Sequence, residues 1–397
     1  MHKPTYYIYL LLLFCSLTII VNASIVAPRV APSPSPWKPN FQHVGALAMN
    51  TLESTPFTLR GKLYVQQAMM GNFAPDNLAH SYFCIHAADT GAVISCPNSS
   101  SGFAFQSSIV DDARGVLFVF GSAWDRAQSK TPDCRPWGCG ACAEGHCNVS
   151  VWSTRDLVNW VGPTVAVQLP PNVTVPNVAV GFRDRVTPPP PAGLPPHQAF
   201  MILESSSEMA INTGSDGDLS VNWQFLNTSY RMTNAGEAPG CPAARFNARD
   251  GYYYVMGGGN YVDIARSRTL LQGSWQVTPL GPVEAGCVRN FEDCSVGTTM
   301  ARIAPNFYTE YWAKGLDNGN RIFLNNLTEW NWSVNDVDFC DNGGAGPTTF
   351  IYGFCAQTKP ANATGHFGDG YMIGVSPLSA VEWLASFFPP ASEDEIS

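Results

Sequence analysis

The chain has 397 residues, of which 45% are hydrophobic and only 13% are charged, and its formal net charge at pH 7 is −9. With 35 glycines and 31 prolines it is rich in turns, and this composition excludes an intrinsically disordered chain. The acidic balance, with no cluster of basic residues in the sequence, argues against nucleic acid and anionic membranes as partners.

The first residues predict export. His2 and Lys3 precede a long apolar run, and Val21-Asn22-Ala23 offers small residues for cleavage. We therefore expect a signal peptide at residues 1–23 and a secreted protein with no membrane contact after cleavage. A membrane anchor is the alternative, but the apolar run is shorter than the roughly 20 residues that a membrane-spanning helix needs.

Short aromatic and apolar runs dominate the rest of the chain. A Pro/Ser-rich linker is expected at residues 24–44, a folded domain at 45–388 and an acidic tail at 389–397. Each run follows a turn signal and is typical of a β-strand. The five runs begin at Gly61, Gly115, Gln198, Gly251 and Thr348.

A second element recurs behind most of these runs. It consists of a strand, a polar turn, a leucine or valine, and a tryptophan that opens the next strand; the tryptophans are Trp160, Trp223, Trp275 and Trp383. Repeated units of about four short strands predict an all-β fold, a five-bladed β-propeller with a central funnel-shaped pocket. An irregular β-sandwich is the alternative.

The cysteines indicate disulfide bonds. There are twelve, and Cys15 lies in the signal segment, so an odd number remains and at least one stays unpaired or pairs between chains. Sequence proximity favours the pairs Cys84–Cys96, Cys287–Cys294 and Cys340–Cys355. The four cysteines within residues 134–147 form two bridges or a zinc site, and an oxidising compartment favours bridges.

Asn-x-Ser/Thr sequons predict N-glycosylation in surface loops. They lie at Asn98, Asn148, Asn172, Asn227, Asn326, Asn331 and Asn362.

Polar residues lie close to several strands where a propeller would bring strand starts together. Glu53 precedes the first aromatic run, Glu237 precedes the fourth, and Asp336 and Asp338 lie two apart in one strand. Two carboxyl groups across a pocket, one protonated and one ionised, are what glycoside hydrolysis requires. Further polar side chains are expected to bind the sugar hydroxyls; these are Glu204, Asp336, Arg245, Gln357 and Asn177.

Several motifs resemble five-bladed propeller glycosidases of glycoside hydrolase families 32 and 43. They are "STRDLVNW", "IARSRTLLQGSW", "CPAARFNARDGYYYVMGGG" and the strand pair "NDVDFCDN…FIYGFCAQ". The resemblance implies a propeller over about residues 45–388 and an activity on glycosidic bonds.

The resemblance also implies roles for three carboxylates. Glu237 in "EAPGCP" occupies the place of the family's general acid. Glu53 in "LESTP" stands where the family has an Asp that acts as base or nucleophile. The third family carboxylate, which tunes the acid, is matched by Asp338 or by Asp184 in "FRDR", and we favour Asp338.

The sequence therefore predicts a secreted, N-glycosylated glycoside hydrolase that acts on a plant, algal or other oligosaccharide by a two-carboxylate mechanism. We expect a monomer that needs no cofactor; some related propellers hold a structural calcium, but no residue pattern here indicates one. The alternative function is a non-catalytic carbohydrate-binding propeller, because Glu stands in place of the family's Asp at residue 53.

Overall fold

A computed structural model describes most of the chain between Gln42 and Phe388. The described residues are 42–69, 82–88, 92–123, 148–169, 177–183, 193–204, 208–227, 229–230, 232, 242–257, 263–277, 335–340, 348–354, 369–376, 378–385 and 388. For 42–53 and nearly all of 335–376 the description is of the backbone. The expected signal peptide and acidic tail lie outside the described residues.

Three antiparallel sheets of four strands follow one another along the chain. Blade 2 comprises β5 (Phe103–Asp111), β6 (Val116–Ala123), β7 (Asn148–Thr154) and β8 (Trp160–Gln168). Blade 3 comprises β9 (Val178–Phe182), β10 (Ala199–Leu203), β11 (Met209–Asn212) and β12 (Trp223–Phe225). Blade 4 comprises β13 (Ala243–Asn247), β14 (Tyr252–Gly257), β15 (Asp263–Ser267) and β16 (Gln276–Val277).

The other two blades share one seven-stranded sheet, ordered β17-β18-β19-β1-β2-β3-β4. Its strands are β17 (Asn335–Cys340), β18 (Thr348–Phe354), β19 (Asp369–Ser376), β1 (Gln42–Leu59), β2 (Lys62–Met69), β3 (Tyr82–Ala87) and β4 (Val93–Ser95).

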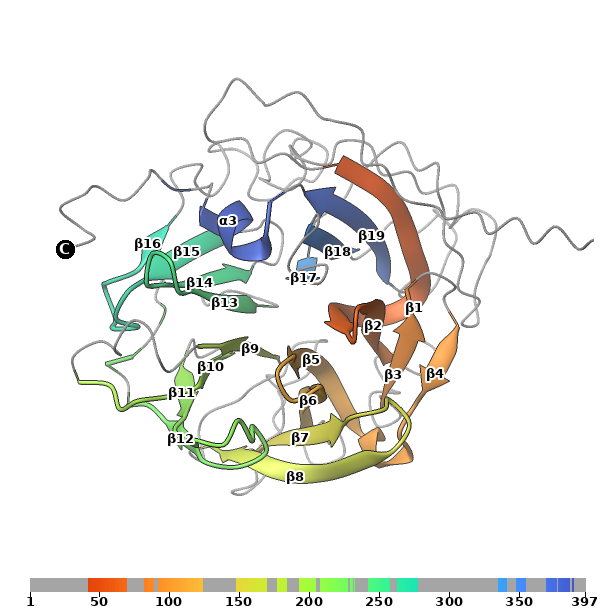
Figure 1. Cartoon of the computed structure of the whole chain (residues 1–397), viewed down its shortest axis with the longest axis horizontal. Helices are drawn as coiled ribbons and strands as arrows, with labels where there is room; N and C mark the ends of the chain where they lie inside the picture. Colours follow the sequence, from red (N-terminus) through yellow and green to blue (C-terminus); the bar gives the residue numbers. More distant parts are fainter. Residues whose placement is uncertain are drawn as a thin grey trace, which may run out of the picture. The chain divides into compact units, whose positions relative to one another are not determined.

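Strand β1 belongs to two blades. Its first part pairs with β19, from Gln42 opposite Val375 to Thr51 opposite Asp369. Its second part pairs with β2 as far as Leu59 opposite Lys62. β1 is therefore the outermost strand of blade 5 and then the innermost strand of blade 1, which closes the ring in Figure 1.

The innermost strands are β1, β5, β9, β13 and β17, and each contacts the next around the ring. Apolar side chains from neighbouring sheets fill three of the seams. The ring of Phe83 contacts that of Trp152 between blades 1 and 2, Phe120 contacts Trp223 between blades 2 and 3, and Phe200 contacts Tyr253 between blades 3 and 4. This cyclic arrangement confirms the predicted all-β propeller over the alternative of a sandwich.

The aromatic runs form the second strand of each blade: β2, β6, β10, β14 and β18. They are buried on both faces where side chains are described, as in β10 and most of β14. In each blade the strand that precedes the run along the chain and pairs with it is the innermost strand, as β1 pairs with β2 and β13 with β14. β1 begins at Gln42, slightly ahead of residue 45, where the domain was expected to start.

The prediction that a tryptophan opens the strand after the polar turn is confirmed in three blades and is wrong in the last. Trp160 and Trp223 open β8 and β12, and Trp275 directly precedes β16. Trp383 instead lies in α3 (Ala380–Ala385), a short helix, and its side chain is fully buried. Blade 5 needs no outer strand from this segment because β1 already supplies it.

The turn before each tryptophan explains the recurring Ser/Thr and Leu. In blade 2 the Thr154 hydroxyl accepts the backbone N–H of Leu157 at 3.0 Å, and in blade 4 the Ser267 hydroxyl accepts that of Leu270 at 3.1 Å. Both leucines are buried and have positive φ, 64° and 58°. The hydroxyl therefore stabilises a strained turn that places the leucine in the core.

Asp156 in the first of these turns gives a pH-dependent prediction. Its carboxylate accepts the backbone N–H groups of Val158 and Asn159, at 2.9 and 2.7 Å. The hydrogen bonds to Asn159 and Val158 hold the pKa of Asp156 well below its usual value of 3.8. Since the folded-state pKa is depressed, this stabilisation is present above about pH 4 and is lost as the pH falls through the folded pKa. We expect Asp156→Ala to lower the Tm at pH 7.

Thermal denaturation of both proteins across a pH series tests this expectation. The Tm difference between wild type and variant should shrink below about pH 4, as the wild-type carboxyl becomes protonated. A difference that stays constant into strong acid would contradict the assignment.

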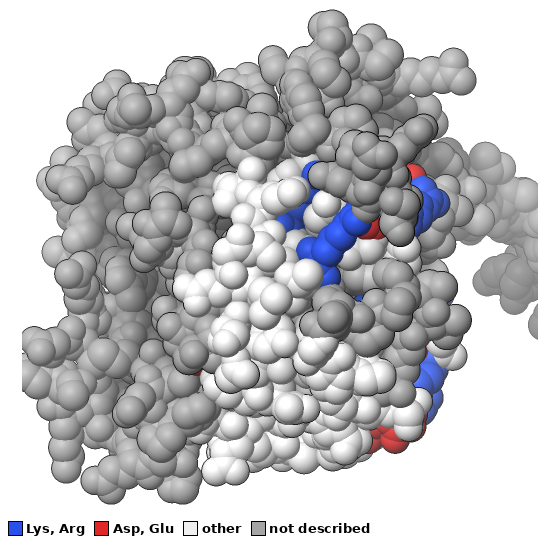
Figure 2. Space-filling view, turned by 90° about the vertical axis from the view of Figure 1, so that its left-hand side faces the viewer, with Lys and Arg blue, Asp and Glu red and all other residues white. Residues whose placement is uncertain are grey.

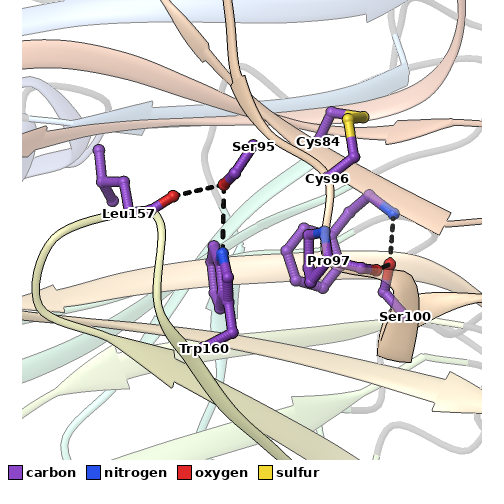
Figure 3. Close-up of a disulfide and its surroundings, with 8 residues drawn as sticks. Cys84, Ser95, Cys96, Pro97, Ser100, Leu157 and Trp160 are labelled. Atoms are coloured by element: carbon purple, nitrogen blue, oxygen red, sulfur yellow. Dashed lines mark hydrogen bonds between the residues drawn. A yellow bond between two sulfur atoms is a disulfide. The ribbon is translucent and has the colours of Figure 1, made fainter.

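A disulfide and its neighbours hold blade 1 against blade 2 (Figure 3). Cys84 and Cys96 are bonded, as their spacing predicted. Next to Cys96, the Ser95 hydroxyl donates to the Leu157 carbonyl oxygen and accepts the indole N–H of Trp160 at 3.1 Å. The disulfide therefore fixes a segment that makes hydrogen bonds to the neighbouring blade. Cys355, the partner predicted for Cys340, and both members of the predicted pair Cys287–Cys294 lie outside the described residues.

Figure 2 views the left-hand side of the ring of Figure 1 and shows a mostly uncharged described surface. Most of its few basic side chains lie in the upper right of the view and another lies at the lower right, with acidic side chains near some of them. The exposed pair Arg249–Glu382, at 2.7 Å, links the β13–β14 turn to α3. No helix among the described residues is long and apolar enough to span a membrane.

Candidate functional site

Two of the predicted site residues are backbone neighbours in blade 3, where β10 ends and β9 begins. The backbone N–H of Glu204 donates to the carbonyl oxygen of Asn177 at 3.0 Å, which extends the pairing of β9 with β10 by one residue. Asn177 is buried and Glu204 half-buried. The structure therefore brings together these two predicted substrate-binding residues.

Glu208 lies at the same end of blade 3, one register position from the Asn177–Glu204 pair, and was not predicted from the sequence. The backbone N–H of Leu203 donates to its carbonyl oxygen at 2.9 Å, so Glu208 lies directly across the β10–β11 hairpin from Leu203. Its side chain is buried, which is uncommon for a glutamate. The available signal was a second glutamate directly before an apolar strand, "EMAIN", but the preceding serines made it read as part of a loop.

An ion pair links the innermost strands of blades 4 and 5. Nη2 of Arg245 on β13 lies 3.2 Å from Oδ1 of Asp338 on β17. Asp338 is 8% exposed, and Nη1 of Arg245 donates to the carbonyl oxygen of Ala244 at 2.7 Å. The two residues are 93 positions apart in the sequence. The fold thus pairs the Asp338 carboxylate with the Arg245 guanidinium, which compensates its charge. Together the two groups supply hydrogen-bond acceptors and donors that can orient sugar hydroxyls.

Buried amides lie on an innermost strand in blade 2 and on the second strand in blade 1. Gln106 on β5 is 1% exposed, and its Nε2 donates to the Phe103 carbonyl oxygen at 2.7 Å. On blade 1, Gln66 and Gln67 are both fully buried in β2, opposite Thr55 and Ser54 of β1. By contrast Asp111 lies in the β5–β6 turn, where Oδ1 accepts the Arg114 N–H at 3.1 Å, which is a structural role.

The remaining predicted site residues are placed only in part. Glu53 lies in β1 opposite Ala68, and Asp336 lies in β17 within the irregular stretch between Asn335 and Asp338. The description of both is of the backbone. Glu237 and Gln357 lie outside the described residues. Their roles, and the separation of the two catalytic carboxyl groups, remain predictions.

A buried polar network lies in the seam between blades 3 and 4, at the end of β9 opposite to Asn177. Nε2 of His197 and the Tyr253 hydroxyl are 2.9 Å apart, and the guanidinium of buried Arg183 lies 5.0 Å from the centre of the Phe246 ring. Burial raises the pKa of Tyr253 to about 12, although the nearby Arg183 opposes the shift. The phenol therefore stays protonated at physiological pH and serves as a hydrogen-bond donor that ties the seam together.

Among the described residues, no three His, Cys, Asp or Glu side chains are grouped so that they could hold a metal ion. The cysteine-rich stretch 134–147, where disulfides or a zinc site were predicted, lies outside the described residues.

Comparisons with known proteins concern the fold. No protein-family model and no curated protein matches the chain. The catalytic domain of a GH62 α-L-arabinofuranosidase from Coprinopsis cinerea superposes with a TM-score of 0.50 at 9% identity, over 87% of this chain and 99% of that one. A Podospora anserina α-L-arabinofuranosidase, solved with cellotriose, gives 0.48 at 10% identity, over 86% and 99%.

A thermostable family-43 glycoside hydrolase gives a TM-score of 0.45 at 10% identity, over 83% of this chain and 89% of that one. At such identities the similarity concerns the fold alone. The statement about the fold rests on the Coprinopsis match, whose TM-score is 0.50. The resemblance drawn from the sequence motifs is thereby confirmed at the level of architecture. The chain adopts the five-bladed β-propeller fold found in the catalytic domain of a GH62 glycoside hydrolase.

Proposed function

We propose that this protein is a secreted glycoside hydrolase that acts on an oligosaccharide of plant, algal or other origin. The observation that carries the proposal is the Arg245–Asp338 pair, which joins two innermost strands of a propeller whose fold is shared with a GH62 catalytic domain. A buried carboxylate held by an arginine costs desolvation energy, and such groups are concentrated at functional sites.

In this proposal Glu237 is the general acid, which protonates the leaving-group oxygen, and Glu53 is the base or nucleophile. Asp338 tunes the acid. Glycoside hydrolysis requires one carboxyl group protonated and the other ionised on opposite sides of the scissile bond. Arg245, Asn177, Glu204, Asp336 and Gln357 bind the sugar, and Glu208 is added to them because it is a buried glutamate at the same end of blade 3.

The solved proteins of similar fold suggest which substrates to try first. Two of them are α-L-arabinofuranosidases and one is a family-43 glycoside hydrolase. The substrate panel therefore contains aryl α-L-arabinofuranoside, aryl β-xyloside, aryl galactosides and mannosides, and arabinose-substituted xylan and arabinan oligosaccharides.

We expect the secreted protein to release a sugar from at least one member of this panel and Glu237→Gln to release none. The matched control is Glu382→Gln, which removes an exposed carboxylate from α3 and should leave the rate unchanged. A fully active Glu237→Gln variant would refute the assigned mechanism. Sugar binding without hydrolysis would favour the non-catalytic carbohydrate-binding alternative.

A further inference from the structure

The exposed apolar side chains of this protein gather at the outer strands of the ring. Within the described part of the chain, every large hydrophobic side chain that is exposed lies on the outermost strand of a blade or in the turn that leads to one. They are Val93 and Ile94 on β4, Val161 and Val165 on β8, and Val158, Val221 and Leu271 in the turns before β8, β12 and β16. An exposed apolar sheet edge is a surface on which a second chain can pair, so such edges are usually protected.

The edge formed by β8 is the longest of these and carries no charge. β8 has 9 residues without an acidic or basic side chain among them, whereas β4, β12 and β16 have only two or three residues each. Val161 and Val165 on β8 are 70% and 49% exposed. Short length and charged side chains are two common protections of a sheet edge, and β8 has neither. Pro163 removes a backbone donor at only one position of this edge.

A glycosylation sequon lies beside β8. The 3-10 helix η2 (Asn98–Ser100) follows β4 and contacts β8. The Ser99 hydroxyl accepts the indole N–H of Trp152 on β7 at 3.1 Å. Ser150, two residues before Trp152 and therefore on the same face of β7, is the partner of Val165. Val165 is thus on the face of blade 2 that contacts η2.

The asparagine of this sequon is exposed and its serine is buried. Asn98 is exposed, whereas Ser100 is fully buried. The Ser100 hydroxyl donates to the Pro97 carbonyl oxygen at 2.7 Å and accepts the N–H of Phe83 at 3.2 Å (Figure 3). A sequon is recognised through both its asparagine and its hydroxyl residue. The glycan must therefore be added before this segment folds, and the fold then leaves the asparagine at the surface.

The other two described sequons differ from this one in position. Asn148 is half-buried in β7, which has a partner strand on each side, and its Oδ1 is buried. Asn227 is exposed, and its Oδ1 accepts the N–H of Ser229 at 2.9 Å. The Ser229 carbonyl oxygen accepts the N–H of Gln272 at 2.8 Å, so this sequon lies at the seam between blades 3 and 4. Asn227 is therefore a matched control for Asn98.

We propose that Asn98 is an N-glycan attachment site and that its glycan shields the edge of β8 from pairing with a second copy of this chain. The Asn98 side-chain nitrogen bonds to C1 of an oligosaccharide carried on a lipid diphosphate. The bond from C1 to the diphosphate oxygen breaks, and the nitrogen gives one proton to a base of the transferase. The attached sugar is bulky and solubilising, which supplies the protection that β8 lacks. This goes beyond the proposed hydrolysis and depends only on the proposed secretion.

The test expresses wild type, Asn98→Gln and Asn227→Gln in a secretory host that N-glycosylates. Enzymatic release of the glycan converts a modified asparagine into aspartate, so peptide mass spectrometry of the secreted wild type should show this change at Asn98. Size-exclusion chromatography with light scattering then measures association. Asn98→Gln should contain at least about threefold more associated protein than Asn227→Gln, which loses a comparable glycan at another seam.

Two further measurements separate shielding from folding. The Tm of Asn98→Gln should stay within about 2 °C of wild type, because the substituted side chain is exposed. Val165→Lys, combined with Asn98→Gln, places a charge on the edge of β8 and should return the associated fraction to that of wild type. Val221→Lys, in the turn before β12, is the control for this rescue and should leave the association unchanged.

An unmodified Asn98 in the secreted protein would overturn the site, and so would a chain that is retained in the cell without this glycan. Equal association of the two glutamine variants or a large Tm loss for Asn98→Gln would overturn the shielding role. Failure of Val165→Lys to rescue, or equal rescue by Val221→Lys, would do the same. Sugar hydrolysis by a protein unmodified at Asn98 would refute this proposal and keep the proposed enzyme. A shielded protein without hydrolytic activity would do the reverse.

Discussion

Arg245→Met is expected to lower the free energy of unfolding by about 2–3 kcal/mol, somewhat below the range for a fully buried pair. The substitution leaves the Asp338 carboxylate, 8% exposed, without the guanidinium that compensates its charge. The two side chains are 21% and 11% exposed, so solvent screens part of the interaction. Urea denaturation monitored by tryptophan fluorescence measures the change.

The exposed pair Arg249–Glu382 supplies the matched control. Its side chains are 78% and 42% exposed, and we expect Arg249→Met to change stability by less than about 0.5 kcal/mol. The double variant Arg245→Met/Asp338→Leu should recover much of the loss, because it removes both charges together. If Arg245→Met and Arg249→Met lowered the free energy of unfolding equally, the interior pair would contribute no more to stability than the exposed pair.

Removing the Cys84–Cys96 disulfide should lower the unfolding free energy by about 3 kcal/mol, the amount expected for a short closed loop. The two cysteines are 12 positions apart, and both are replaced by alanine in the test variant. The loss has a second source here. Ser95, next to Cys96, bonds Leu157 and Trp160 of blade 2, so an untethered segment weakens the seam between the blades.

Chemical denaturation of the wild type with and without a reductant, beside the double alanine variant, measures this effect. Ser99→Ala is the control, since it removes one hydrogen bond across the same seam, from Trp152 Nε1 at 3.1 Å, and leaves the disulfide in place. Its effect should be about 1 kcal/mol. A double alanine variant as stable as wild type would contradict the tethering role.

The architecture could be predicted because its signals are local. Glycine-containing turns and aromatic runs mark the second strands, and the Thr154–Leu157 and Ser267–Leu270 turns recur with the same geometry. The assignment of Trp383 to a strand was wrong because the real outer strand of blade 5 comes from the other end of the chain. No local pattern reports which distant segment completes a sheet.

The candidate site could be predicted only as an inventory of residues. Arg245 and Asp338 were each selected, but their pairing depends on how blades 4 and 5 meet. Glu208 was missed because burial is what distinguishes it, and a glutamate after serines looks like a surface residue. Burial of a polar group is a property of the assembled ring rather than of a short segment.

The double role of β1 has a consequence for how the chain folds during its synthesis. Gln42 pairs with Val375, so the first half of β1 cannot acquire its partner until nearly the whole chain has been made. Contacts between such distant residues slow folding, since the entropy of closing the long loop must be overcome before the contact forms. Throughout that interval the segment is an unpaired strand edge, the kind that pairs with a second copy. Exchange of this half-strand between two molecules is therefore the misassembly to which the closure of this ring is most exposed.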